Sequence, residues 1–536
     1  MTNIRTFTRR LSYLISMSWR HKCSKAATVC LAMALLPDGA GLARQAESDK
    51  AVDGVFHYKP YTESEIEARL QKPLALDDCI RIALRNNITL RISEGDLARA
   101  EASRAGSYGA FLPVFTLSGA RANSLAREAR RVSRSTRGLP DSLSPLIRSN
   151  FDNQATIVGE AQLFTLTGAT LQFANDFVHD VQSPPDQAMK KNDKRSYSFT
   201  FTQPLLRGAG PMVARNQFLS AGYDEQIQSK RLDNTKLQTV LNVKRAYYDA
   251  LSKREIVKVN ESAVASDSVL INASQALIVA KLASRRDLLS AQIRFADDRT
   301  SLITSENDYQ FALDALKDVM GVPIEMPIAL DSTGLKFVPV TLNEAALIRS
   351  ALETSPSLQS QVAALQQRKL QHRVAKNAVL PQLDFVASYS SDLGRDAVLN
   401  QDASRSSGWE ATVNVSYTFL NRDEAAKAED AQIAVRQQED QLREQQRQIV
   451  INVRDIVRSV YSGAEEINAI QQSIRLAEDK YAFANTMFSL GRASNFDITD
   501  AQEFLLKAKN QYLRKLVEYY TQLALLESLT GQRVTP

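Results

Sequence analysis

The side chains best placed for chemistry in this chain are the carboxylates of Asp497 and Asp500, three residues apart. On a helix this spacing puts both on one face. Asp497 also suits the first turn of a helix, where a carboxylate accepts hydrogen bonds from free backbone N–H groups, and Asp287 stands in an equivalent place. The sequence therefore favours a concentration of negative charge or a helix cap, and the two are compatible.

Residue types that support catalysis or bind metals have no suitable partners. The four histidines are His21, His57, His179 and His372. None of them has the spacing of metal ligands. Gly208-Ala-Gly210 is not followed by the Lys-Ser/Thr of a phosphate-binding loop. The sequence predicts no enzyme, no cofactor and no metal site.

Residues 1–43 have the layout of a secretory signal peptide. Basic residues precede the apolar run Ala26–Leu36, and Gly41-Leu42-Ala43 supplies a small-residue cleavage site. This segment carries +5 of the formal net charge of +6, so the remainder has no general attraction for nucleic acid. No run of 18 or more apolar residues follows, and no membrane-spanning helix is predicted.

The chain repeats itself over long distances. The paired segments are Leu84–Leu90 with Leu352–Leu358 and Leu112-Pro113 with Leu380-Pro381, both 268 residues apart, and Ala283-Ser284 with Ala493-Ser494, 210 apart. Repeats this large are too long for solenoid units and indicate a duplicated half. The predicted parts are a signal peptide (1–43), an irregular N-terminal segment (44–73), a first repeat (74–321), a linker (322–341), a second repeat (342–531) and a tail (532–536).

Each repeat is predicted to contain a helix, two strands, a very long helix and a returning helix. Apolar residues at spacings of three and four, such as Ile449, Val453 and Ile456, are typical of helices packed as coiled coils. The predicted helices are 76–111, 211–280, 287–321, 342–379, 423–490 and 496–530. Alternation of apolar with small polar residues predicts strands that face two different solvents. The predicted strands are 113–121, 196–206, 381–391 and 408–419.

The first repeat carries an additional segment, 122–195, between its strands. We expect an extracellular loop here if the strands cross a membrane. Seven arginines between Arg121 and Arg148 suit either lipopolysaccharide phosphates or a solvated surface. A hairpin turning at Thr167-Gly168 is also compatible with the sequence, so whether 161–173 adds strands stays open.

With these features the chain resembles the TolC family of outer membrane efflux and secretion proteins over roughly residues 74–531. The resemblance rests on the duplicated helix–Leu-Pro–strand unit and on Gln203–Gly208, Tyr417–Arg422, Leu490–Ser494, Asp497 and Ala501. It implies an α+β membrane protein. A homotrimer would form a 12-stranded β-barrel in the Gram-negative outer membrane, four strands from each chain, continued by a long periplasmic α-helical barrel.

The resemblance also implies the partners and the functional residues. The partners are a periplasmic adaptor, an inner-membrane transporter, outer membrane lipid and lipopolysaccharide. The channel would passively export substrates in an efflux or type I secretion system. The implied aperture residues are Asp287, Asp497 and Asp500. The implied adaptor contacts at the tips are Leu282, Ala283, Ser284, Gly491, Arg492, Ala493 and Ser494.

Two other classes remain open at this stage. A soluble coiled-coil scaffold explains the helical periodicity but not the duplicated Leu-Pro-strand units. A secreted or surface trimeric coiled-coil adhesin explains the signal peptide, but it does not predict a tip turn before each returning helix.

Overall fold

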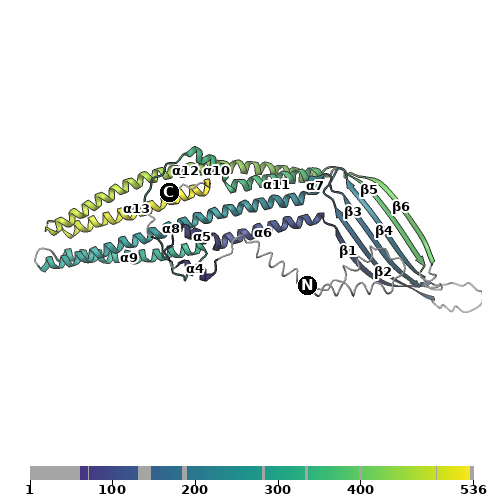
Figure 1. Ribbon diagram of the computed structural model, residues 1–536, viewed down its shortest axis with the longest axis horizontal. Coiled ribbons are helices and arrows are strands. Elements are labelled where there is room, and N and C mark those ends of the chain that lie inside the picture. The colour runs from purple at the N-terminus through teal and green to yellow at the C-terminus, as the bar shows by residue number, and fades with distance from the viewer. Residues whose placement is uncertain are drawn as a thin grey trace, which may run out of the picture. The chain divides into compact units, whose positions relative to one another are not determined.

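The structure, a computed structural model, describes residues 61–536 apart from several short segments. The segments outside the described residues are 71, 131–145, 184–189, 280–283, 332–335, 397–400, 491 and 532–536. The predicted signal peptide, most of the N-terminal segment and the tail therefore lie outside the described residues. Figure 1 shows long helices lying side by side and strands gathered in one sheet.

The helix before the strands is interrupted at the same point in both repeats. The helices concerned are α5 (Leu76–Asn86), α6 (Ile88–Tyr108), α10 (Glu344–Thr354) and α11 (Pro356–Ala378). The predictions of single helices over 76–111 and 342–379 are therefore wrong. Ser355 avoids the helical conformation because Pro356 follows it. Asn87 instead caps α6, and its side chain accepts a hydrogen bond from the Leu90 N–H at 3.0 Å.

Two long helices carry the rest of the helical region. They are α8 (Asn216–Val279), preceded by the short α7 (Pro211–Ala214), and α12 (Arg422–Ser489). They return through α9 (Arg285–Met320) and α13 (Asn495–Thr530) respectively. The helices α5, α6, α9, α11 and α13 all pack against α8, while α10, α11 and α13 pack against α12. Since α11 and α13 contact both long helices, they join the two repeats.

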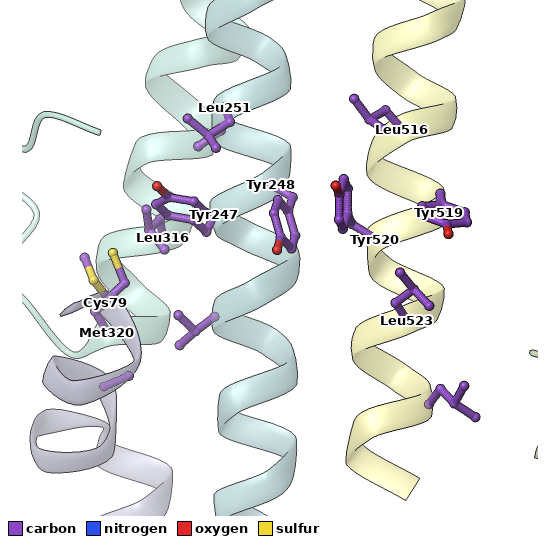
Figure 2. Packing of buried hydrophobic residues seen from close by; sticks show 14 of the residues in the cluster. Cys79, Tyr247, Tyr248, Leu251, Leu316, Met320, Leu516, Tyr519, Tyr520 and Leu523 are labelled. Carbon is purple, nitrogen blue, oxygen red and sulfur yellow. The ribbon is translucent and has the colours of Figure 1, made fainter. Parts of the chain in front are cut away.

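The main core lies between α8, α13 and the helices around them. Tyr248 of α8 stacks on Tyr520 of α13 with ring centroids 4.9 Å apart (Figure 2). In the same contact Lys244 forms a buried ion pair with Glu527. Cys79 is fully buried in this cluster, and burial raises the pKa of its thiol to about 12. A thiol in this environment is an apolar packing residue rather than a nucleophile.

The N-terminal segment and the linker lie against this core. The described part of the N-terminal segment contains a helix, α4 (Glu63–Leu70), where the sequence predicted irregular chain. Leu74 forms an isolated parallel bridge with Leu330 of the linker. The Tyr519 hydroxyl donates to the carbonyl of Val338 at 3.2 Å. The linker is thereby fixed to α13, which belongs to the second repeat.

Among the described helices, α8 alone is long and apolar enough to span a membrane, by length and composition only. The sequence prediction overlooked it because the apolar residues of α8 are interspersed with small polar ones rather than forming one run. Core helices pass the same test, and α8 packs against α5, α6, α9, α11 and α13.

The sheet is an antiparallel meander with its strands in chain order. The strands are β1 (Val114–Arg130), β2 (Leu146–Phe164), β3 (Thr170–Ser183), β4 (Lys190–Pro204), β5 (Gln382–Asp396) and β6 (Gln401–Ser416). β2 and β3 fall within 122–195, which was predicted to be an extracellular loop. Four strands per chain is therefore wrong, since the described residues form six. The predicted barrel of twelve strands from three copies depended on four strands per chain and is not supported by this sheet.

Candidate functional site

The tip of the first helical hairpin is capped by Ser284 and Asp287. The backbone N–H and hydroxyl of Ser284 donate to Oδ2 of Asp287 at 3.0 and 2.7 Å. The Asp287 N–H returns a bond to the Ser284 hydroxyl at 3.3 Å, which completes a capping box at the start of α9. These hydrogen bonds from Ser284 lower the pKa of the Asp287 carboxyl.

The second hairpin repeats this arrangement 210 residues later. Ser494 donates its backbone N–H and its hydroxyl to Oδ2 of Asp497, both at 2.8 Å, at the start of α13. The bonds from Ser494 lower the pKa of the Asp497 carboxyl, so this exposed side chain stays ionised well below neutral pH. Of the two readings drawn from the sequence, the structure shows the cap at both aspartates. A concentration of negative charge around an aperture requires further copies of the chain, and it is compatible with the cap.

Asp500 follows one helical turn after Asp497 and forms an ion pair. Its Oδ2 lies 2.6 Å from Nζ of Lys480 on α12. The same ammonium lies 4.0 Å from the centre of the Phe504 ring, a cation–π distance. The pair is about half-exposed, so screening by water keeps its contribution to stability small.

The remaining predicted tip residues are only partly described. Leu282, Ala283 and Gly491 lie outside the described residues. Arg492 is exposed, and its backbone N–H donates to the Met487 carbonyl at 2.8 Å, which closes the turn after α12. Ala493 is half-buried between Arg492 and the capping serine.

Asn495, which sequence reasoning missed, ties the two tips together. Its side-chain amide is almost fully buried and donates to the Ser274 hydroxyl of α8 at 2.6 Å. It also lies 3.0 Å from the Asp287 carbonyl. The first turn of α13 is thereby attached to both helices of the first hairpin.

Further along the same contact, Gln502 of α13 binds a buried carboxylate of α8. Its amide donates to Oδ1 of Asp267 at 2.9 Å. Asp267 is 1% exposed, and its Oδ2 is buried without a hydrogen-bond partner among the residues that the structure describes. Burial, reinforced by the neighbouring carboxylate of Asp298, raises the pKa of Asp267 to about 7. Arg294 offsets part of the negative charge of this carboxylate pair, because its Nε lies 3.2 Å from Oδ2 of Asp298.

A sequence signal for this contact exists, but it indicates packing rather than chemistry. Ala291-Gln292 recurs as Ala501-Gln502 at the 210-residue offset. Both alanines are fully buried, where α9 and α13 approach a small apolar cluster that contains Leu270 and Ile498. The repeat marks a close helix contact, but Asp267 has no counterpart that would reveal it in the sequence.

The second repeat matches a known family model. The match covers residues 347–532, and the family is described as outer membrane efflux protein. Residues 347–532 are therefore similar to an outer membrane efflux domain. The resemblance to the TolC family is confirmed. No curated protein matches the chain in sequence.

Solved structures of outer-membrane channels match nearly the whole chain, including the repeat before the efflux domain. The outer-membrane channel OprN aligns with 90% of this chain and 96% of its own, at 14% identity and a TM-score of 0.63. VceC from Vibrio cholerae covers 88% and 98% at 14% identity, with a TM-score of 0.62. The open state of MtrE from Neisseria gonorrhoeae covers 86% and 89% at 13% identity, with a TM-score of 0.59. The chain therefore has the fold of these channels.

Proposed function

We propose that the chain is the outer membrane channel of a tripartite export system, and that it passively conducts substrates delivered by an inner-membrane transporter through a periplasmic adaptor. The match of residues 347–532 to outer membrane efflux proteins carries this proposal. The long helices support it, because the 64 residues of α8 span about 96 Å. A duct of that length reaches far from the membrane toward a partner.

A homotrimer in the Gram-negative outer membrane is part of the proposal. One chain provides an open sheet, and an open sheet edge in lipid leaves backbone N–H and C=O groups unpaired at several kcal/mol each. Copies of the chain would pair those edges and enclose a channel. A trimeric adhesin without transport activity is the alternative, and it is distinguished by an absence of ion conductance in planar bilayers.

We propose that Asp287, Asp497 and Asp500 narrow the periplasmic entrance and favour cations. The variant Asp497→Asn/Asp500→Asn keeps an acceptor for the Ser494 cap and removes both charges. We expect a higher single-channel conductance and a weaker cation preference, measured from reversal potentials in planar bilayers. The control is Asp440→Asn/Glu444→Gln on exposed positions of α12. Equal conductance and selectivity in wild type and variant would show that these carboxylates do not line the aperture.

The tip residues 282–284 and 491–494 are proposed to contact the adaptor, and Arg492 provides the test. Its side chain is exposed at the turn between α12 and α13. Charge reversal in Arg492→Glu is expected to reduce adaptor cross-linking in cells and to lower export. Arg443→Glu is the matched control, since Arg443 is also exposed, on α12, but is distant in sequence from the tip. Normal cross-linking in the Arg492 variant contradicts the assignment.

A further inference from the structure

The hairpin β2–β3 shares one continuous hydrogen-bonded sheet with the other four strands. β2 pairs with β1 along seventeen positions, from Val114↔Gln162 to Arg130↔Leu146. β3 pairs with β4 from Thr170↔Thr202 to Gln182↔Lys190. We propose that this hairpin forms part of the membrane wall, so that three copies close into an eighteen-stranded barrel wider than one built from four strands per chain. This inference rests on the proposed channel function.

Residues that pair directly across antiparallel strands point to the same face of the sheet. One such row crosses all six strands and is aromatic at five of its six positions. The row is Phe115, Ala161, Phe173, Phe199, Tyr389 and Trp409. Its aromatic side chains are all exposed, from 44% at Phe173 to 80% at Trp409. An exposed row that is aromatic at five of six positions fits the lipid face of a barrel, and the hairpin contributes Phe173 to it.

The opposite face is polar, and the hairpin follows the same pattern there. The neighbouring rows on that face are Val114, Gln162, Gln172, Thr200, Ser388 and Glu410, and Thr116, Glu160, Ala174, Ser198, Ser390 and Gly408. Glu160, Gln162 and Gln172 come from the hairpin. A loop folded over a barrel mouth is not required to place apolar residues on one face and polar residues on the other. A strand in the barrel wall lies between lipid and water, so it must have an apolar face and a polar face.

The turn of the hairpin is attached at the helical end of the sheet. The Thr165 N–H donates to the Ala169 carbonyl at 2.8 Å, and the Thr167 hydroxyl donates to the Gln203 side chain at 3.4 Å. Phe164 stacks on Phe111, which follows α6, with ring centroids 5.9 Å apart. The hairpin therefore extends through the sheet from the same end as β1 and β4.

The occupant of the two open edges is a second copy of this chain. β1 and β6 have similar lengths, seventeen and sixteen residues, and their outward edges have no strand partner among the described residues. In a six-stranded meander the first and last strands run in opposite directions, so β6 of one copy meets β1 of the next in antiparallel orientation. Closure by three copies satisfies every edge.

The strand count sets the width of the channel. At equal strand tilt, eighteen strands give about one and a half times the circumference of twelve, in the range where barrels hold an open aqueous lumen. The outer membrane part would then admit wider substrates than the four-strand expectation allows. Any size limit would be set at the helical tips.

Cysteine pairs distinguish a hairpin in the wall from a hairpin outside it. In a full-length background with Cys23, Cys30 and Cys79 replaced by Ala, Phe173→Cys/Phe199→Cys places thiols on the paired strands β3 and β4. The matched pair Phe115→Cys/Phe199→Cys can form a disulfide only if β1 lies beside β4, since bonded Cα atoms lie within about 7 Å. In outer membranes we expect a disulfide in the first pair and none in the second, identified by mass spectrometry of peptides.

A second series tests the joint between copies. Trp409→Cys is combined with cysteines placed in turn from Val114 to Leu117, and oxidation is expected to give covalent dimers and trimers for at least one position. A disulfide between positions 115 and 199 in a conducting trimer overturns the eighteen-strand wall and leaves the proposed function intact. A chain that is monomeric and does not conduct ions overturns the proposed function, and with it this inference.

Discussion

Gly321→Ala is expected to destabilise the junction between α9 and α5 by about 2–5 kcal/mol. Gly321 ends α9 in the left-handed conformation, with φ of 69°, which costs a residue with a side chain roughly 1–2 kcal/mol. A Cβ there would also lie 2.4 Å from the carbonyl oxygen of Asn86. Backbone cannot move aside as a flexible side chain does, so the contact adds a packing penalty of about 1–3 kcal/mol.

Gly531→Ala is the matched control, because it isolates the backbone conformation from the clash. Gly531 ends α13 with φ of 65°, but the nearest atom to its added Cβ is the Thr354 hydroxyl at 3.6 Å. We expect a loss of about 1 kcal/mol there. Native-state hydrogen exchange of amides in α5 and in the last turns of α9 and α13 measures both losses. Equal losses in the two variants would contradict the proposed contact at Asn86.

This contact also shows why the helix break at Asn87 was not predicted. At Ser355 the following proline gives a local signal for the end of a helix, and the equivalent Asn87 lies 268 residues earlier. Asn87 gives a weaker local signal, because asparagine favours an N-cap but does not exclude the helical conformation as a following proline does. Its side chain donates to the Val319 carbonyl at 2.8 Å, so the break serves a contact with a residue 232 positions away. Local patterns place helices well, but they cannot show where another helix end must fit.

The strands illustrate the same limit. Alternation of apolar and polar residues is clear around Phe199, Tyr389 and Val413, and the predicted strands lie there. The stretch from Leu146 to Glu160 is mixed in polarity. Its alternation of apolar and polar residues can be recognised only when the strand is aligned with β1 and β3. Strand identity in this hairpin comes from cross-strand pairing, which a single segment does not encode.

At the tips the sequence predicts the caps and misses the contacts between hairpins. Asp287 and Asp497 lie at fixed distances from their capping serines, so a short pattern suffices. Asn495 and Gln502 bind residues more than 200 positions away. Only the register of α13 against α8 shows that Asp267 faces Gln502 in a buried contact.

Asp267→Asn is expected to remove a pH dependence from this contact. The pKa of Asp267 is raised from an ordinary value of 3.8 to about 7, so the folded chain holds a proton that the unfolded chain releases. The stability contributed by this group is therefore full below about pH 4, falls as the pH rises toward 7, and is constant above. Each pKa unit is worth about 1.4 kcal/mol, so ionisation weakens the contact by a few kcal/mol.

The measurement is hydrogen exchange of the amides in Ala263–Leu270 and Ile498–Gln502 at pH 5 and pH 8, corrected for intrinsic rates. Asn retains the acceptor for Gln502 and carries no charge at either pH. Between pH 5 and pH 8 we expect protection in wild type to fall on the order of a hundredfold, since about two pKa units separate pH 5 from the folded pKa, and protection in Asp267→Asn to stay nearly constant. Asp297→Asn is the control, since Asp297 is the exposed neighbour of Asp298. If wild type and Asp267→Asn show the same change between the two pH values, the titrating group lies elsewhere. If they differ as expected, the joint between the two hairpins loosens as the pH rises, because the buried carboxyl at α8 loses its proton.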